Sequence, residues 1–188
     1  MTARPYRHID FTALKIKWRV QTRPRNRVQE LNAANRSDDM RSDPEGIVEA
    51  SLTAYALGDY ETAAAYYSPD AVFTLSADEE ISPFDGEWRG RDAIVSCWQE
   101  IGEAFDVLRF EPRNISASGD VVRCQIRFEL RHRASGEVMD SVARCVFEVQ
   151  DGLIVREAEY NDVERMRAFL RLCDHSDHVR ERVSAKRL

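Results

Sequence analysis

The 188-residue chain lacks several features that would assign a protein to a class at once. Its four cysteines form no C-x-x-C pair, which argues against a zinc site or a disulfide framework and predicts free, mostly buried thiols. No apolar run approaches the roughly 20 residues that span a bilayer, and the first residues lack the apolar core of a secretory signal. We therefore expect a soluble, cytoplasmic protein with no membrane partner.

Common catalytic and metal-binding motifs are also missing. The sequence has no glycine-rich phosphate loop, no nucleophile elbow and no H-E-x-x-H motif. Asp174-His175 and Asp177-His178 offer metal-ligand side chains near the C-terminus, but no third ligand is predicted to converge on them. We expect no metal and no other cofactor.

Charge divides the chain into two parts. Residues 1–43 carry ten Lys and Arg against five Asp and Glu, whereas residues 44–173 carry 13 against 25. An acidic domain repels phosphate groups, so nucleic acid is not an expected partner. Scattered apolar residues and two Arg-Pro pairs predict that residues 1–43 are a disordered basic extension. This segment is an arm for a partner or nucleic acid, a disordered extension without such a role, or sequence upstream of a start at Met40.

The remaining sequence predicts an α+β domain over residues 44–172 and a polar tail over residues 173–188. Asp43-Pro44 is typical of a helix start, and Gly58-Asp59 is typical of one helix ending where the next is capped. Ser68-Pro69-Asp70 predicts a turn between the second helix, residues 60–67, and a strand.

Periodicity predicts the second half of the domain. Apolar residues at helical spacing indicate helices over residues 91–105 and 163–172. Between them, four segments separated by turn residues are expected to form consecutive antiparallel strands: residues 107–115, 121–133, 138–149 and 153–161. The inward row of the third strand includes the small residues Ser141, Ala143 and Cys145, which leave room for a cavity between sheet and helices.

The order of these elements, with the segments SPDAVF, GEWRGRDAIVSCW and FEVQDGLIVREAEYND, resembles the SnoaL-like branch of the nuclear transport factor 2 fold superfamily. The resemblance covers residues 44 to about 172 and implies a curved antiparallel sheet wrapped around helices in a cone with an internal cavity. It leaves the function open, because this fold includes isomerases, polyketide cyclases, epoxide hydrolases, dehydratases and noncatalytic modules.

The resemblance also identifies candidate catalytic positions. The general base of ketosteroid isomerases matches Leu75 here, and the acid that binds the oxyanion falls near Cys145. The Arg and Asp of limonene-type epoxide hydrolases fall at about Phe128 and Leu130. Only the last catalytic Asp of those hydrolases is matched by an acid, Glu159 in EAEYND.

Glu159 is therefore the candidate catalytic carboxylate, and His132, on the apolar face of a neighbouring strand, is the candidate proton relay. If Glu159 faces the cavity, Glu157 and Asn161 face it too. The opposite orientation places Glu159 at the sheet surface beside an arginine, and His132 near a hairpin end is then a structural residue. The candidate ligand-binding residues are Tyr55, Phe73, Trp98, Cys145, Glu157 and Asn161, although aromatic residues at helical spacing also suit a core.

Two functions follow from these residues. One is a cofactor-independent acid/base enzyme, such as a cyclase, isomerase, hydratase or dehydratase, acting on a small, largely apolar molecule. The other is a noncatalytic module that binds a small ligand or associates with a partner. The resemblance further implies a homodimer through the outer face of the sheet, where side chains of both charges are predicted: Arg109, Glu111, Arg123, Arg127, Glu129 and Arg144.

Overall fold

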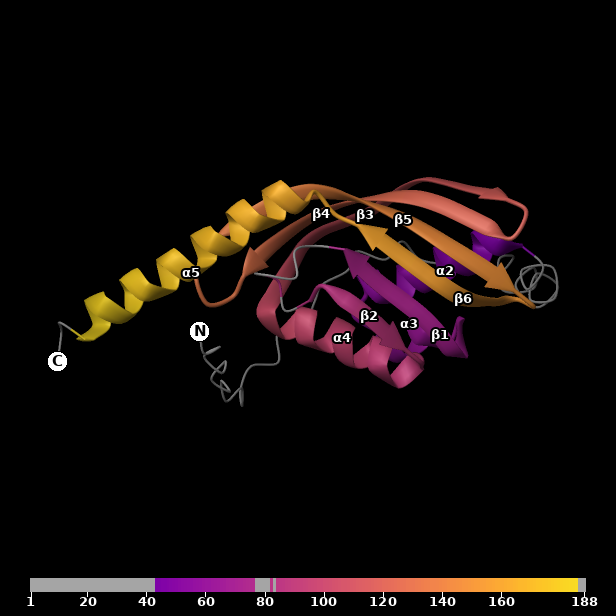
Figure 1. Ribbon diagram of the computed structural model, residues 1–188, viewed down its shortest axis with the longest axis horizontal. Helices are drawn as coiled ribbons and strands as arrows, with labels where there is room; N and C mark the ends of the chain where they lie inside the picture. Colours follow the sequence, from indigo (N-terminus) through magenta and orange to yellow (C-terminus); the bar gives the residue numbers. More distant parts are fainter. Residues whose placement is uncertain (1–42, 77–81, 83, 186–188) are drawn as a thin grey trace, which may run out of the picture. The chain divides into compact units, whose positions relative to one another are not determined.

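The computed structural model describes residues 43–76, 82 and 84–185, with side chains described as far as His175. The predictions for residues 1–42 lie outside this range. The described part contains four helices and one six-stranded sheet in the order β2-β1-β6-β5-β4-β3 (Figure 1). The elements are α2 (Pro44–Ala56), α3 (Tyr60–Ala64), β1 (Tyr67–Ser76), β2 (Gly86–Arg89), α4 (Arg91–Ala104), β3 (Phe105–Ser118), β4 (Val121–His132), β5 (Val138–Gln150), β6 (Leu153–Tyr160) and α5 (Val163–Ala185).

Short-range signals set the first two helices. The Asp43 side chain accepts a hydrogen bond from the Glu45 backbone N–H at 3.1 Å and caps α2, with Pro44 at its first position. Asp59 caps α3 in the same way through the Thr62 N–H, also at 3.1 Å. Gly58, between the helices, has a φ of +73° that glycine adopts without steric cost. The predicted starts of both helices and the break between them are confirmed.

Strand β1 begins earlier than predicted. The turn expected at Ser68-Pro69-Asp70 is instead part of the strand, which starts at Tyr67, and α3 ends at Ala64 rather than at Tyr67. The pairing with β6 shifts register between Tyr67 and Val72, so this irregularity accommodates the proline, which has no N–H to donate to a ladder. As a result, the side chain of Tyr67 enters the core.

The sheet is mixed rather than wholly antiparallel. Strands β3 to β6 pair consecutively and antiparallel, as predicted, but β1 pairs with β6 in parallel. This places β6 in the interior of the sheet. Glu157 lies between Phe73 of β1 and Phe147 of β5, and Glu159 lies between Leu75 and Cys145.

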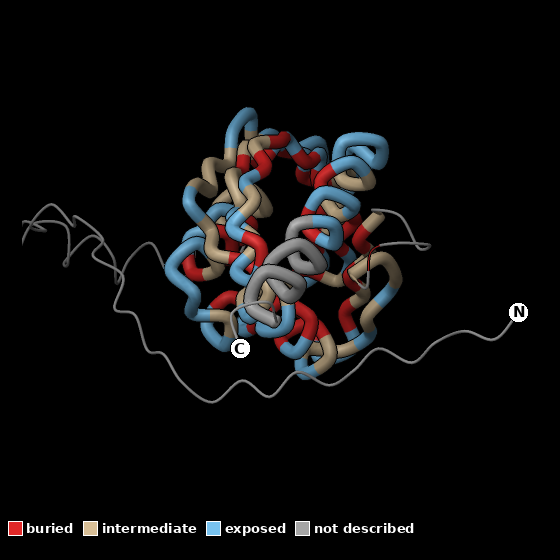
Figure 2. Tube along the Cα trace, turned by 90° about the vertical axis from the view of Figure 1, so that its left-hand side faces the viewer, coloured by how far each residue is buried: buried red, intermediate tan, exposed pale blue. Residues whose placement is uncertain are grey.

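One face of the sheet is covered by helices. Helices α2 and α4 pack against it, and buried residues gather on the inner sides of the strands and helices (Figure 2). The four cysteines are free and buried, as predicted. The domain core therefore lies between α2, α4 and the inner face of the sheet.

Helix α5 is longer than predicted. It was expected to end at Leu172 but continues to Ala185. The segment from Val163 to Ala185 contains neither glycine nor proline, and polar residues alone do not end a helix. Within the described residues, no helix combines the length and apolarity needed to span a membrane.

Candidate functional site

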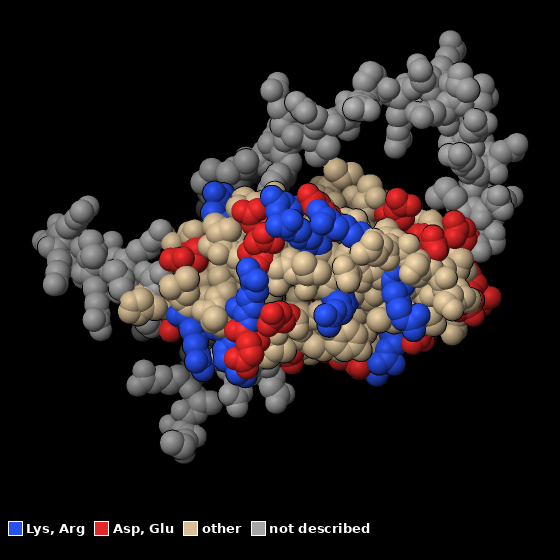
Figure 3. Space-filling view, turned by 90° about the horizontal axis from the view of Figure 1, so that it is seen from above, with Lys and Arg blue, Asp and Glu red and all other residues tan. Residues whose placement is uncertain are grey.

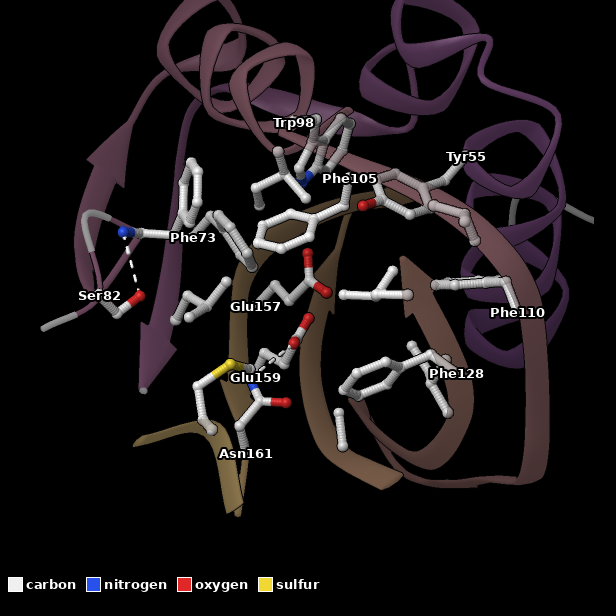
Figure 4. Close-up of a pocket in the computed structure, with 18 of the residues that line it drawn as sticks. Tyr55, Phe73, Ser82, Trp98, Phe105, Phe110, Phe128, Glu157, Glu159 and Asn161 are labelled. Atoms are coloured by element: carbon white, nitrogen blue, oxygen red, sulfur yellow. Dashed lines mark hydrogen bonds between the residues drawn. The ribbon is translucent and has the colours of Figure 1, made fainter. Parts of the chain in front are cut away.

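An apolar cavity lies between the inner face of the sheet and the helices, with about 100 Å³ open to the centre of a water-sized molecule. Aromatic side chains form much of its wall, and three polar residues at the end of β6 and just after it interrupt this apolar lining (Figure 4). These three are Glu157, Glu159 and Asn161. The sequence left open whether Glu159 faces the cavity or the sheet surface, because charged residues occur on both faces of β6. In the structure, Glu159 faces the cavity.

Trp98 on α4 is the centre of an aromatic cluster beside the carboxyl groups. Its ring lies edge-on to Tyr55 and Tyr67, with ring centroids 5.3 and 5.5 Å away, and 6.3 Å from Phe73. The cavity lining includes three of the aromatic residues expected to bind a ligand: Tyr55, Phe73 and Trp98. They also pack on one another, so the same rings serve the core and present an apolar surface to a ligand.

Glu157 is almost fully buried, with 4% of its surface exposed. The hydroxyl of Tyr67, itself 1% exposed, donates a hydrogen bond to its Oε2 atom. Burial raises the pKa of Glu157 to about 8; the hydrogen bond from Tyr67 opposes this shift, and the negative charge of Glu159 adds to it. At neutral pH, Glu157 is therefore mostly a neutral acid that can donate a proton.

Glu159 lies two positions further along β6 and lines the same cavity. Burial raises the pKa of its carboxyl group, while the Asn161 side chain donates a hydrogen bond from Nδ2 to Oε1 at 2.9 Å and lowers it. The charge of Glu159 also raises the pKa of Glu157, so the two carboxyl groups titrate as a coupled pair. Their hydrogen-bond partners differ: Tyr67 donates to Glu157 and Asn161 to Glu159.

Cys145 completes a small cluster with the two glutamates. One ligand atom from each of these three residues lies within 4.8 Å of the other two. Contact with Cys124 and burial raise the pKa of the Cys145 thiol. The pKa values of all three groups are thus raised, and a metal ion at this cluster would bind their deprotonated forms.

His132 does not point towards Glu159, so that expectation is wrong. Its Nδ1 atom lies 2.9 Å from Ser135 Oγ at the β4–β5 turn, and its ring packs 5.4 Å from Phe105. Glu159 lies opposite Cys145, which lies opposite Cys124. His132 is eight residues beyond Cys124, about 26 Å along the strand. The alternation of apolar and polar residues correctly predicts which face of β4 carries His132. It does not predict how far along the strand His132 lies from Glu159.

The sequence indicates Tyr67 as one of several aromatic residues that can line a ligand site, and it does line the cavity, but its contact with Glu157 was not predicted. The segment Tyr67-Ser68-Pro69-Asp70 has the composition of a turn, and the irregularity in β1 breaks the alternation that would have marked Tyr67 as inward-facing. Only the long-range pairing of β1 with β6 brings its hydroxyl to Glu157.

The family model for the SnoaL-like domain matches residues 48–157, more than half of the chain. The chain therefore belongs to the SnoaL-like domain family. No curated protein matches it.

Solved structures show the same fold. A nuclear transport factor 2-like protein from Burkholderia thailandensis is 24% identical over 68% of this chain and 96% of its own, with a TM-score of 0.62. A candidate polyketide cyclase from Xanthomonas campestris is 21% identical over 70% of this chain and 98% of its own, with a TM-score of 0.58. TerC, co-crystallised with polyporic acid, is 17% identical over 69% and 99% of the two chains, with a TM-score of 0.62.

Proposed function

We propose that the protein is a cofactor-independent enzyme that transfers protons on a small, largely apolar molecule bound in the cavity. The observation that carries the proposal is the pair of carboxyl groups, Glu157 and Glu159, in an apolar cavity with an open mouth. Both pKa values are raised, and perturbed carboxyl groups in a cleft are typical of acid/base sites. A closed and wholly apolar cavity would instead favour ligand binding alone.

The two glutamates take different roles. Glu159 removes a proton from a carbon atom next to a carbonyl group, and Asn161 holds the carboxylate in place through the Nδ2 hydrogen bond. Glu157, protonated at neutral pH, donates a hydrogen bond or its proton to the oxygen where negative charge develops. Proton exchange with solvent through the mouth of the cavity restores both groups. This cycle fits a cyclase, isomerase, hydratase or dehydratase.

The cavity wall favours a flat, largely apolar substrate. Tyr55, Phe73 and Trp98 present ring edges and faces to the space beside the carboxyl groups (Figure 4). Two structures of the same fold support a small organic molecule as the ligand: TerC was co-crystallised with polyporic acid, and the Xanthomonas protein is a candidate polyketide cyclase.

The test begins with a thermal-shift screen of small aromatic ketones and related polyketide-like compounds, followed by turnover assays on those that bind. Glu159→Gln should lower turnover by about 10²- to 10⁴-fold while ligand binding and fold remain. Glu49→Gln, at an exposed position of α2, is the matched control and should leave turnover unchanged. Full activity in Glu159→Gln would overturn the catalytic assignment.

A noncatalytic ligand-binding module is the second candidate. Leu75, which matches the base of ketosteroid isomerases, lines the cavity next to Glu159 and cannot accept a proton. Compounds that bind with affinities unchanged in Glu159→Gln, and that the wild-type protein never converts, would support this function over the enzyme.

A further inference from the structure

A second concavity lies on the outer side of the sheet. Its wall includes the side chains of Arg113, Arg127, Arg144 and Arg165, and we call it the arginine groove. The alternation of β4 and β5 directs Arg127 and Arg144 away from the cavity, because Ile126 and Ala143 face inward. Figure 3, seen from above Figure 1, shows groups of basic and acidic residues separated by uncharged surface.

Two aspartates also line the groove, but both are already engaged. Asp140 accepts hydrogen bonds from the Arg127 guanidinium, the shorter at 2.7 Å, and lies 3.8 Å from Arg109. Asp162 accepts a hydrogen bond from the backbone N–H of Arg165 at 3.1 Å, which caps the start of α5. The Asp140 carboxylate is therefore already paired with arginine, whereas Asp162 keeps its negative charge, because a bond from a backbone N–H does not neutralise it.

Two of the four arginines form no direct ion pair within the described residues, although the charge of Arg165 helps to lower the pKa of Asp140. Arg113 pairs with Glu111 at 2.5 Å, and Arg127 pairs with Asp140. Arg144 and Arg165 form no ion pair with any residue in the part of the chain that the structure describes. Their guanidinium groups add to the partial positive charge of the α5 N-terminus, which the groove also contains.

We propose that the arginine groove is a binding site for an oxyanion, namely a carboxylate or phosphate group on a small molecule. Arg144 and Arg165 are its direct ligands, because planar guanidinium groups match the two oxygens of a carboxylate or phosphate. Arg127, whose charge Asp140 neutralises through two hydrogen bonds, contributes a fixed wall to the groove. Tyr160, which is 51% exposed, adds a hydroxyl donor at the groove.

Asn161 connects the groove with the cavity and provides a reporter. It lines both spaces, and its Nδ2 group donates to Glu159 while its buried Oδ1 atom has no hydrogen-bond partner. The side-chain amide resonances of Asn161 should therefore shift when an anion enters the groove.

The test is a titration followed by ¹⁵N NMR with inorganic phosphate, and separately with acetate, at ionic strength held constant with sodium chloride. Saturable shifts are expected at the side chains of Arg144, Arg165 and Asn161. Stronger binding of phosphate or of acetate identifies the preferred group. Shifts that grow linearly without saturation, or that chloride reproduces, would overturn the proposal.

Variants distinguish specific anion binding in the arginine groove from nonspecific attraction to positive surface charge. Arg144→Gln combined with Arg165→Gln should weaken phosphate binding by about tenfold or more, because each removes a charge-assisted hydrogen bond. Arg123→Gln is the control, since Arg123 is exposed on the same face of β4 and lies outside the groove. Undiminished binding in the double variant, or an equal loss in Arg123→Gln, would each overturn the proposal.

Discussion

Tyr67 donates a hydrogen bond to Glu157 from a position 90 residues away in the sequence. Both side chains are almost completely buried, so neither can exchange this bond for one with water. The protonation state of Glu157 therefore contributes directly to the stability of the fold.

The first prediction concerns stability against pH. Burial raises the pKa of Glu157 from 4.5 to about 8, so the folded protein keeps a proton that the unfolded chain loses. The stability from this group is present below about pH 4.5 and is lost as pH rises through about 8. The loss is on the order of 5 kcal/mol at most, at about 1.4 kcal/mol per pKa unit.

Urea unfolding of wild type and Glu157→Gln between about pH 5 and 9 tests this. Wild type should lose stability relative to the variant as pH rises, because glutamine cannot ionise. Glu49→Gln, at an exposed position, should follow the wild-type curve. Parallel curves for wild type and Glu157→Gln would contradict the assignment of Glu157 as a buried neutral acid.

Removal of the Tyr67 hydroxyl should raise the pKa of Glu157 further, because the hydrogen bond from Tyr67 lowers it. Tyr67→Phe should also cost about 1–3 kcal/mol of stability, since it leaves a buried acceptor without its donor. ¹³C NMR titration of the Glu157 carboxyl group measures the first effect, and urea unfolding the second. Tyr66→Phe at the adjacent residue is the control; a Glu157 pKa unchanged in Tyr67→Phe would refute the prediction.

Loss of the Asn161 amide should raise the pKa of Glu159, because the Nδ2 hydrogen bond favours the ionised carboxylate. Asn161→Leu should therefore shift the ¹³C titration curve of the Glu159 carboxyl group to higher pH. Gln99→Leu, at an exposed position of α4, should leave that curve in place. A curve that does not move in Asn161→Leu would show that this hydrogen bond is absent in solution.

The outer face of the sheet is our proposed homodimer interface. It carries charges of both signs, including the pairs Arg109–Glu129 at 3.6 Å and Arg127–Asp140 at 2.7 Å, and the valine Val142 is 45% exposed there. Val142→Glu should convert a dimer into a monomer in sedimentation velocity at micromolar concentration. Leu57→Glu, at an exposed apolar residue next to α2, is the control. Wild-type protein that is only monomeric would count against this interface.

This interface and the arginine groove share Val142. Phosphate should therefore compete with dimerisation and shift the sedimentation profile towards the monomer. If phosphate leaves the sedimentation profile unchanged, anion binding in the arginine groove does not compete with dimerisation.

Local signals predicted much of the fold. Asp43 and Asp59 were identified as helix caps because the capping interaction spans only two or three residues. The antiparallel run from β3 to β6 was predicted from alternation and from turn residues such as Gly136, which adopts a φ of +77°. Each of these signals depends on residues close together in the sequence.

The features of the site that the sequence did not predict depend on pairing between strands far apart in the chain. The inward side of β6 depends on its neighbours, since Phe73 and Phe147 flank Glu157 and bring it into the core, although its own charges are ambiguous. Tyr67 was expected as a possible lining residue, but its contact with Glu157 depends on the pairing of β1 with β6. His132 was misplaced because the pairing register, rather than alternation, decides which residues of adjacent strands meet.

The parallel pairing of β1 with β6 also determines how the chain reaches its native state. Phe73 pairs with Glu157, so this contact closes a loop that contains α4 and four other strands, and contacts of such high order form slowly. During synthesis, β1 emerges long before β6 and has an unpaired edge open to other chains. Glu157 and Glu159 are buried away from water only when β1 pairs with β6. Above about pH 4.5, burial of Glu157 between these strands takes up a proton, so their native pairing should lose stability as the solution becomes more alkaline.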